Sequence, residues 1–122
     1  MYTSGSTGLP NGVMIEHAAL INLYWGLYET IYSGIKKSCR IALNGPVSFD
    51  TSVKQIIQIA GGHCLFILPE NVRRHPVELN QYLKENQIDV LDITPSQLNV
   101  FLMKFQWISW IILCLFLLAV KQ

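Results

Sequence analysis

Apolar residues recur along this chain with two different spacings, which predict helices and strands in alternation. Helical spacing, bounded by helix-starting and helix-stopping residues, predicts helices over 17–33, 52–60, 76–86 and 96–103. Short apolar runs between turn residues predict strands over 13–15, 40–43, 63–68 and 89–93. This order is typical of an α/β fold with a mostly parallel sheet and flanking helices.

Two helix ends carry the clearest local signals. Thr94-Pro95 places a hydroxyl residue at the N-cap and a proline at the first helical position, an order that starts a helix. Gly61-Gly62 follows the predicted helix over 52–60 and ends it.

The pattern changes at residue 104. Residues 105–120 contain no charged side chain, and as a helix they would be apolar all round rather than on one face. This run is shorter than the roughly 20 residues that a membrane-spanning helix needs. Two interpretations of the tail over 104–122 stay open: a segment of different origin from the rest, or one that contacts a membrane through residues 105–120.

Composition narrows the function classes. A net charge of +1 without a long basic cluster gives no support for nucleic-acid binding. The three cysteines, Cys39, Cys64 and Cys114, lack the spacing of a zinc or redox motif, so we expect buried thiols in a reducing compartment. The opening residues are polar and glycine-rich, unlike a signal peptide, and the expected location is the cytoplasm. No metal site and no catalytic nucleophile is predicted.

A loop near the N-terminus combines hydroxyl groups with glycines. Its residues are Thr3, Ser4, Gly5, Ser6, Thr7 and Gly8. A backbone of this composition can wrap closely around an anion and donate hydrogen bonds to it, which indicates phosphate binding. The same composition also suits a flexible linker.

The longer string from Tyr2 to Val13 closely resembles the phosphate-loop signature of the adenylate-forming superfamily, the AMP-dependent synthetases and ligases. The resemblance implies ATP with Mg²⁺ as cofactor and phosphate contacts from Thr3 to Gly8. Asn11 stands where the family pattern has lysine. Asparagine cannot neutralise a phosphate, and the loss of one charged contact costs about 1.5–3 kcal/mol.

A second string, Phe49-Asp50-Thr51-Ser52-Val53, resembles the motif of nonribosomal peptide synthetase adenylation domains. In that family the aspartate pairs with the α-amino group of the amino-acid substrate, which implies substrate binding by Asp50 and Thr51. The alternative for Asp50 is an ordinary N-cap of the following helix.

Two charged residues interrupt apolar segments. Lys54 lies one turn after Asp50, and Asp92 interrupts the strand before Thr94-Pro95. The resemblance places both in the pocket for the substrate side chain. Lys54 would suit an acidic or amide side chain such as that of glutamate, although Asp92 would compete for this lysine. The alternatives are a lysine that extends to the surface and an aspartate that caps the next helix.

The resemblance extends from Tyr2 to about Leu102. We therefore predict a partial N-terminal subdomain of an adenylation domain over 1–103 and an unrelated apolar tail over 104–122. The family's later motifs are absent, including its adenine-binding motif and its catalytic lysine, so we expect a truncated domain that is inactive alone. Its parent enzyme would use an amino acid and a carrier-protein domain as partners. The alternative is a small membrane-associated or interaction protein that acts through its tail.

Overall fold

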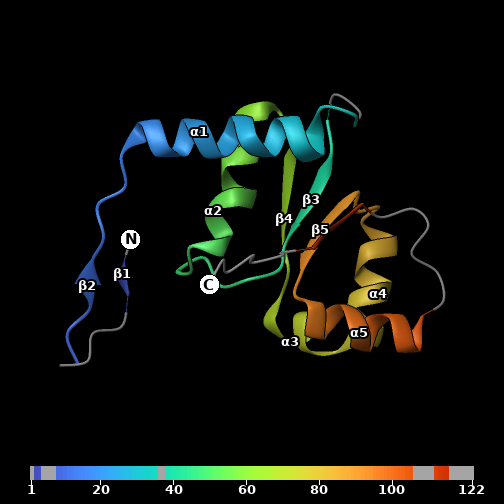
Figure 1. Cartoon of the computed structure of the whole chain (residues 1–122). Helices are drawn as coiled ribbons and strands as arrows, with labels where there is room; N and C mark the ends of the chain where they lie inside the picture. The colour runs from blue at the N-terminus through green and yellow to red at the C-terminus, as the bar shows by residue number, and fades with distance from the viewer. Residues whose placement is uncertain (1, 4–7, 36–37, 106–111, 116–122) are drawn as a thin grey trace.

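The computed structural model describes residues 2–3, 8–35, 38–105 and 112–115 and shows helices packed around a sheet (Figure 1). Its regular elements are β1 (Tyr2–Thr3), β2 (Asn11–Gly12), α1 (His17–Leu27), a π-helical turn (Tyr28–Tyr32), β3 (Arg40–Leu43), α2 (Thr51–Ile56), a 3₁₀ turn (Ile57–Gly61), β4 (Cys64–Ile67), α3 (Glu70–Arg74), α4 (Pro76–Glu85), β5 (Val90–Ile93), α5 (Pro95–Lys104) and β6 (Ile112–Leu115).

The larger sheet is parallel. Within the described residues its strand order is β4-β3-β5-β6, and each neighbouring pair runs in the same direction. The strands β1 and β2 form a separate antiparallel hairpin. The predicted α/β class with a mostly parallel sheet is therefore confirmed.

Each face of the sheet is covered by its own apolar cluster. One cluster joins the strands to α4 and α5, and its buried members are Ala42, Leu68, Leu79, Leu83, Ile88, Leu91, Ile93 and Phe101. The other packs Ile41 and Val90 against the end of α1 and the turn that follows, including Tyr32. Because successive strand residues point to opposite faces, Val90 and Leu91 belong to different clusters.

Most predicted elements occur close to their expected positions. The helix over 17–33 is α1 with its π-helical turn, and the helix over 52–60 is α2 with its 3₁₀ turn, ended by Gly62 in the left-handed conformation. The strand expected over 13–15 is wrong, because the hairpin pairs Asn11–Gly12 instead. The sequence analysis also missed α3, a helix of five residues that is too short for a clear periodicity.

The tail contributes to the sheet. Residues Ile112–Leu115 form β6, which pairs in parallel with β5 in the register Val90↔Ile112 to Ile93↔Leu115. The helix considered for this segment is wrong there, since a parallel neighbour satisfies the backbone of an apolar strand equally well. Among the helices that the structure describes, none has both the length and the hydropathy to cross a bilayer. Residues 106–111 and 116–122 lie outside the described residues.

One expectation for the cysteines needs correction. Cys39 is buried, as predicted, but Cys64 is exposed. Cys64 begins β4, which lies at the edge of the sheet and pairs with one strand among the described residues. The position of β4 in the strand order, which the local sequence does not reveal, therefore leaves this thiol accessible.

Candidate functional site

Asp92 projects from the middle of the sheet towards α2. Its neighbours Leu91 and Ile93 belong to the apolar cluster under α4 and α5, so strand alternation turns Asp92 to the opposite face. That face is covered by α1 and α2. A carboxylate here is taken largely out of water, and its side chain keeps 12% of its exposure.

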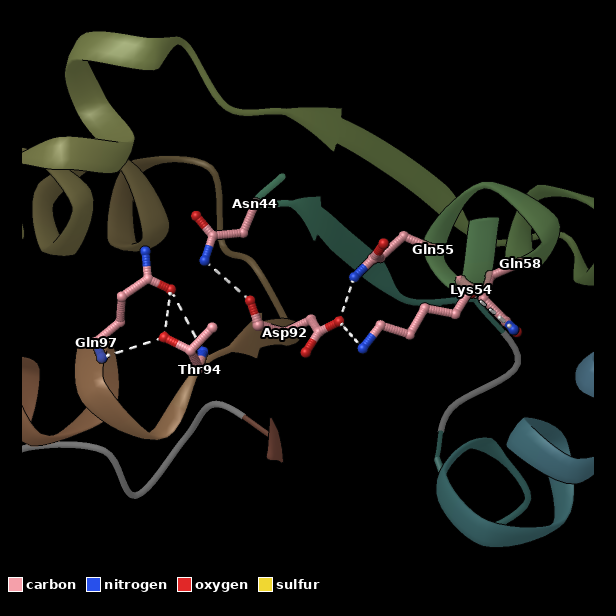
Figure 2. A network of polar contacts seen from close by, with 7 residues as sticks. All are labelled: Asn44, Lys54, Gln55, Gln58, Asp92, Thr94 and Gln97. Carbon is pink, nitrogen blue, oxygen red and sulfur yellow. Dashed lines mark hydrogen bonds and ion pairs between the residues drawn. The ribbon is translucent and has the colours of Figure 1, made fainter. Parts of the chain in front are cut away.

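A network of polar side chains surrounds this carboxylate (Figure 2). Lys54 Nζ forms an ion pair with Asp92 Oδ2, and Gln55 Nε2 donates to the same oxygen at 2.5 Å. Asn44 Nδ2 donates to the Asp92 carbonyl at 2.9 Å. In the 3₁₀ turn after α2, Gln58 Nε2 donates to the Lys54 carbonyl at 3.2 Å. Two side chains of one helix therefore hold a single oxygen atom on the neighbouring strand.

Lys54 does not fit the interpretation of a surface lysine. Its side chain keeps only 14% of its exposure, so it does not extend to the surface as a solvated lysine would. Asp92 does compete for this lysine, as the sequence analysis anticipated. The capping alternative for Asp92 is wrong, because Thr94 caps α5 in a reciprocal arrangement with Gln97.

A cavity of about 90 Å³ lies beside the ion pair. It is lined by Asn44, Gly45, Thr51, Lys54, Gln55, Asp92, Thr94 and Gln97. Two buried acceptors near it, Asn44 Oδ1 and Gln55 Oε1, have no hydrogen-bond partner among the residues that the structure describes. A bound ligand or water would satisfy such groups, which cost free energy when left unpaired.

Asp50 lies directly before α2. It occupies the N-cap position with a helical backbone, and its side chain makes no capping bond to the described residues of α2, so the capping alternative is wrong. Instead it lines a larger cavity of about 540 Å³ together with Thr3 and Phe49. The structure thus brings residues of the two motifs, Tyr2–Val13 and Phe49–Val53, to one cavity, although these motifs are far apart in sequence.

The predicted phosphate loop is described only at its ends. Thr3 pairs with Asn11 in the hairpin, and Gly8 has φ +81, a conformation that glycine adopts at little cost. Ser4, Gly5, Ser6 and Thr7 lie outside the described residues. Asn11, the departure from the family pattern, is exposed in β2.

Sequence reasoning missed three members of the network, Gln55, Asn44 and Gln58. A signal existed for Gln55, because its carboxamide stands beside Lys54 among apolar neighbours such as Val53 and Ile56. Asn44 follows the buried strand β3 directly. In a parallel sheet the carboxyl ends of neighbouring strands share one edge, which brings Asn44 next to β5.

Comparison with known proteins was made at the level of sequence and of structure. A family model described as AMP-binding enzyme matches residues 1–109, past the boundary predicted at residue 103. The chain is 44% identical over 103 residues to AMB antimetabolite synthetase AmbE of Pseudomonas aeruginosa, and 46% identical over 101 residues to bacitracin synthase 1 of Bacillus licheniformis. These matches cover 84% and 82% of this chain but only 5% and 2% of those relatives.

Solved structures share the fold. CmiS6 superposes with a TM-score of 0.67 at 25% identity, covering 84% of this chain and 23% of that protein. The O-succinylbenzoate coenzyme A synthetase MenE of Bacillus subtilis, solved with AMP, superposes with a TM-score of 0.68 at 19% identity. That match covers 94% of this chain and 29% of MenE, and at this identity it speaks for the fold alone.

Proposed function

Since the chain belongs to the AMP-binding enzymes, as part of a nonribosomal peptide synthetase adenylation domain, we propose that it helps to activate an amino acid with ATP. In this reaction the substrate carboxylate attacks the α-phosphorus of ATP, an aminoacyl adenylate forms and pyrophosphate leaves. The chain spans a small fraction of its relatives, 5% or less in the matches described above. Its role is therefore one part of a larger enzyme's site.

The larger cavity takes the reacting end of the amino acid in this proposal. Asp50 accepts a hydrogen bond from the α-amino group, since its carboxylate is exposed, does not cap α2, and faces a cavity of suitable size. Thr3 lines the same cavity and begins the loop, Thr3 to Gly8, that holds the ATP phosphates. Mg²⁺ would be held chiefly by the phosphates of ATP, because this ion retains several waters and uses few protein ligands.

The smaller cavity takes the end of the substrate side chain, and its ion pair is the observation that carries the proposal. Lys54 and Asp92 present a cation and an anion where an adenylation domain for an apolar amino acid would need neither. Together with Thr51 they favour a substrate whose side chain ends in a carboxylate or an amide, such as glutamate. An aliphatic side chain could form no hydrogen bond with either charged group.

The test is amino-acid-dependent pyrophosphate exchange with ATP, measured over the twenty amino acids in the complete adenylation domain. Acidic or amide amino acids should give the highest exchange, and Lys54→Met should remove that preference. Lys84→Met is the matched control, because Lys84 is an exposed lysine in the last turn of α4. A preference for aliphatic or aromatic amino acids would contradict the proposal.

The chain of 122 residues tested alone should give only background exchange. The motifs that bind adenine and supply a catalytic lysine in this family were not found in it. A carrier-protein domain of the complete enzyme would receive the activated amino acid. Clear exchange by the isolated chain would overturn the expectation that it is inactive by itself.

A further inference from the structure

Gln55 is a member of the polar network that the sequence analysis did not predict. It lies on α2 directly after Lys54, and only 6% of it is exposed. Its Nε2 donates to Asp92 Oδ2 at 2.5 Å, the oxygen that also pairs with Lys54. Figure 2 shows both side chains extending from α2 to this one carboxylate.

Packing alone does not explain a glutamine at this position. Two of its neighbours on α2, Val53 and Ile56, are apolar, and its Oε1 is buried with no partner among the described residues. Burial of a half-satisfied carboxamide is unfavourable compared with an apolar side chain of similar volume. A residue that fills this space without contributing to the polar network would therefore be expected to be leucine or methionine.

The hydrogen bond from Gln55 to Asp92 has a fixed direction, which the ion pair with Lys54 lacks. An ammonium on a flexible four-carbon stem is a point charge that imposes little direction. A carboxamide donates along fixed N–H directions. Asn44 Nδ2 donates to the backbone carbonyl of Asp92 at 2.9 Å, and Gln55 Nε2 donates to the Asp92 carboxylate. With both ends of Asp92 held, the position of Oδ2 fixes where the Lys54 ammonium rests.

We propose that Gln55 is a positioning residue of the side-chain pocket, which acts through Asp92 to hold the Lys54 ammonium beside the small cavity. This inference rests on the proposed function, in which the ammonium so placed would meet an acidic or amide group of the substrate. It extends the pocket by a residue that contacts Asp92 directly and acts on the substrate through Lys54.

The first experiment uses the chain itself and does not depend on catalysis. Nitrogen-15 NMR of the lysine side chains reports how fast each ammonium exchanges its protons with water, and a held ammonium exchanges slowly. Gln55→Leu should accelerate exchange at Lys54 by about tenfold, the equivalent of about 1.4 kcal/mol. Gln58→Leu is the matched control, because Gln58 is an equally buried glutamine of the same segment that contacts the Lys54 backbone.

The control should leave exchange at Lys54 unchanged. An unchanged rate in Gln55→Leu, or the same acceleration in both variants, would overturn the positioning role. A second readout needs no substitution and covers the case in which a variant does not fold. In the unmodified chain one Gln55 carboxamide proton should exchange much more slowly than the other, and equal rapid exchange of both would also overturn the inference.

The second experiment measures pyrophosphate exchange in the complete adenylation domain. Gln55→Leu should raise KM for glutamate about tenfold, matching the loss of one hydrogen bond to a charged group, with kcat unchanged. An unchanged KM would contradict the inference. If the unmodified domain shows no preference for acidic or amide amino acids, the proposed function is wrong. The NMR measurement on Lys54 then still tests the positioning role of Gln55 independently.

Discussion

Removing Asp92 alone from its ion pair with Lys54 should destabilise the fold about twice as much as replacing both partners. Asp92→Leu removes both the carboxylate that pairs with the largely buried ammonium of Lys54 and the acceptor of Gln55. Lys54→Met leaves a carboxylate that still accepts a hydrogen bond from Gln55. The double variant removes both charges and fills the space with apolar atoms.

The magnitudes follow from burial and partners. Removing one partner of a buried pair costs 3–5 kcal/mol, and the residual exposure of 14% and 12% places Asp92→Leu at about 3 kcal/mol. Lys54→Met should cost about 1.5 kcal/mol, because the carboxylate keeps one donor. The double variant should also cost about 1.5 kcal/mol, chiefly for the unsatisfied Gln55 amide. The coupling between the two sites is then about 3 kcal/mol.

Urea denaturation followed by circular dichroism at pH 7 measures each free energy of unfolding. A control cycle uses the exposed pair Glu70 and Arg74 of α3, whose side chains keep 62% and 73% of their exposure. That pair should show a coupling of no more than about 0.5 kcal/mol. If the losses at Lys54 and Asp92 simply add within about 0.5 kcal/mol, the buried pair contributes no coupling and the reasoning fails.

Three further predictions concern stability. Burial lowers the pKa of His63 below its ordinary value of 6.5, and its Nδ1 accepts a hydrogen bond from the Cys39 N–H at 3.0 Å. The unfolded chain thus takes up a proton first as pH falls below about 6.5, and the free energy of unfolding should decrease there and stay level above. Thr94→Ala should cost about 1 kcal/mol through loss of the α5 cap. Gly62→Ala should cost about 1 kcal/mol, because φ is +81 although space around it is open.

Each of these has a matched control in urea titrations. His63→Asn should flatten the decrease below pH 6.5, and a decrease of the same size in that variant would assign it to other groups. Ser96→Ala, an exposed hydroxyl in the first turn of α5, should change stability little compared with Thr94→Ala. Gly34→Ala meets open space without a positive φ, so an equal loss there would contradict the backbone argument for Gly62.

Much of the fold could be predicted from rules that involve only residues close in sequence. The start of α5 at Thr94-Pro95 was predictable because capping depends on residues within one turn, and the structure shows the full reciprocal cap. The strands β3 and β5 were predictable because buried parallel strands are continuous apolar runs. The short helix α3 and the hairpin strand Asn11–Gly12 were not, since such short elements depend on their neighbours more than on periodicity.

The candidate site likewise contains residues that the sequence indicated and residues that it did not. Lys54 and Asp92 attracted attention in the sequence because each interrupts an apolar segment. Their pairing could be anticipated only from the family resemblance, and the part played by Gln55 could not be anticipated at all, because 37 positions separate it from Asp92. Such a contact follows from the strand order and from the side of the sheet that α2 covers.

By itself the sequence determined the α/β class, most element positions and the membership of the family, because periodicity, caps and contiguous motifs are properties of neighbouring residues. Only the tertiary structure decided that the two motifs share a cavity, that Asp92 is held by α2 and Asn44, and that Ile112–Leu115 extends the sheet beside β5. The physical reason is that a strand's partner and the face that a side chain meets depend on long-range packing, which no local pattern encodes.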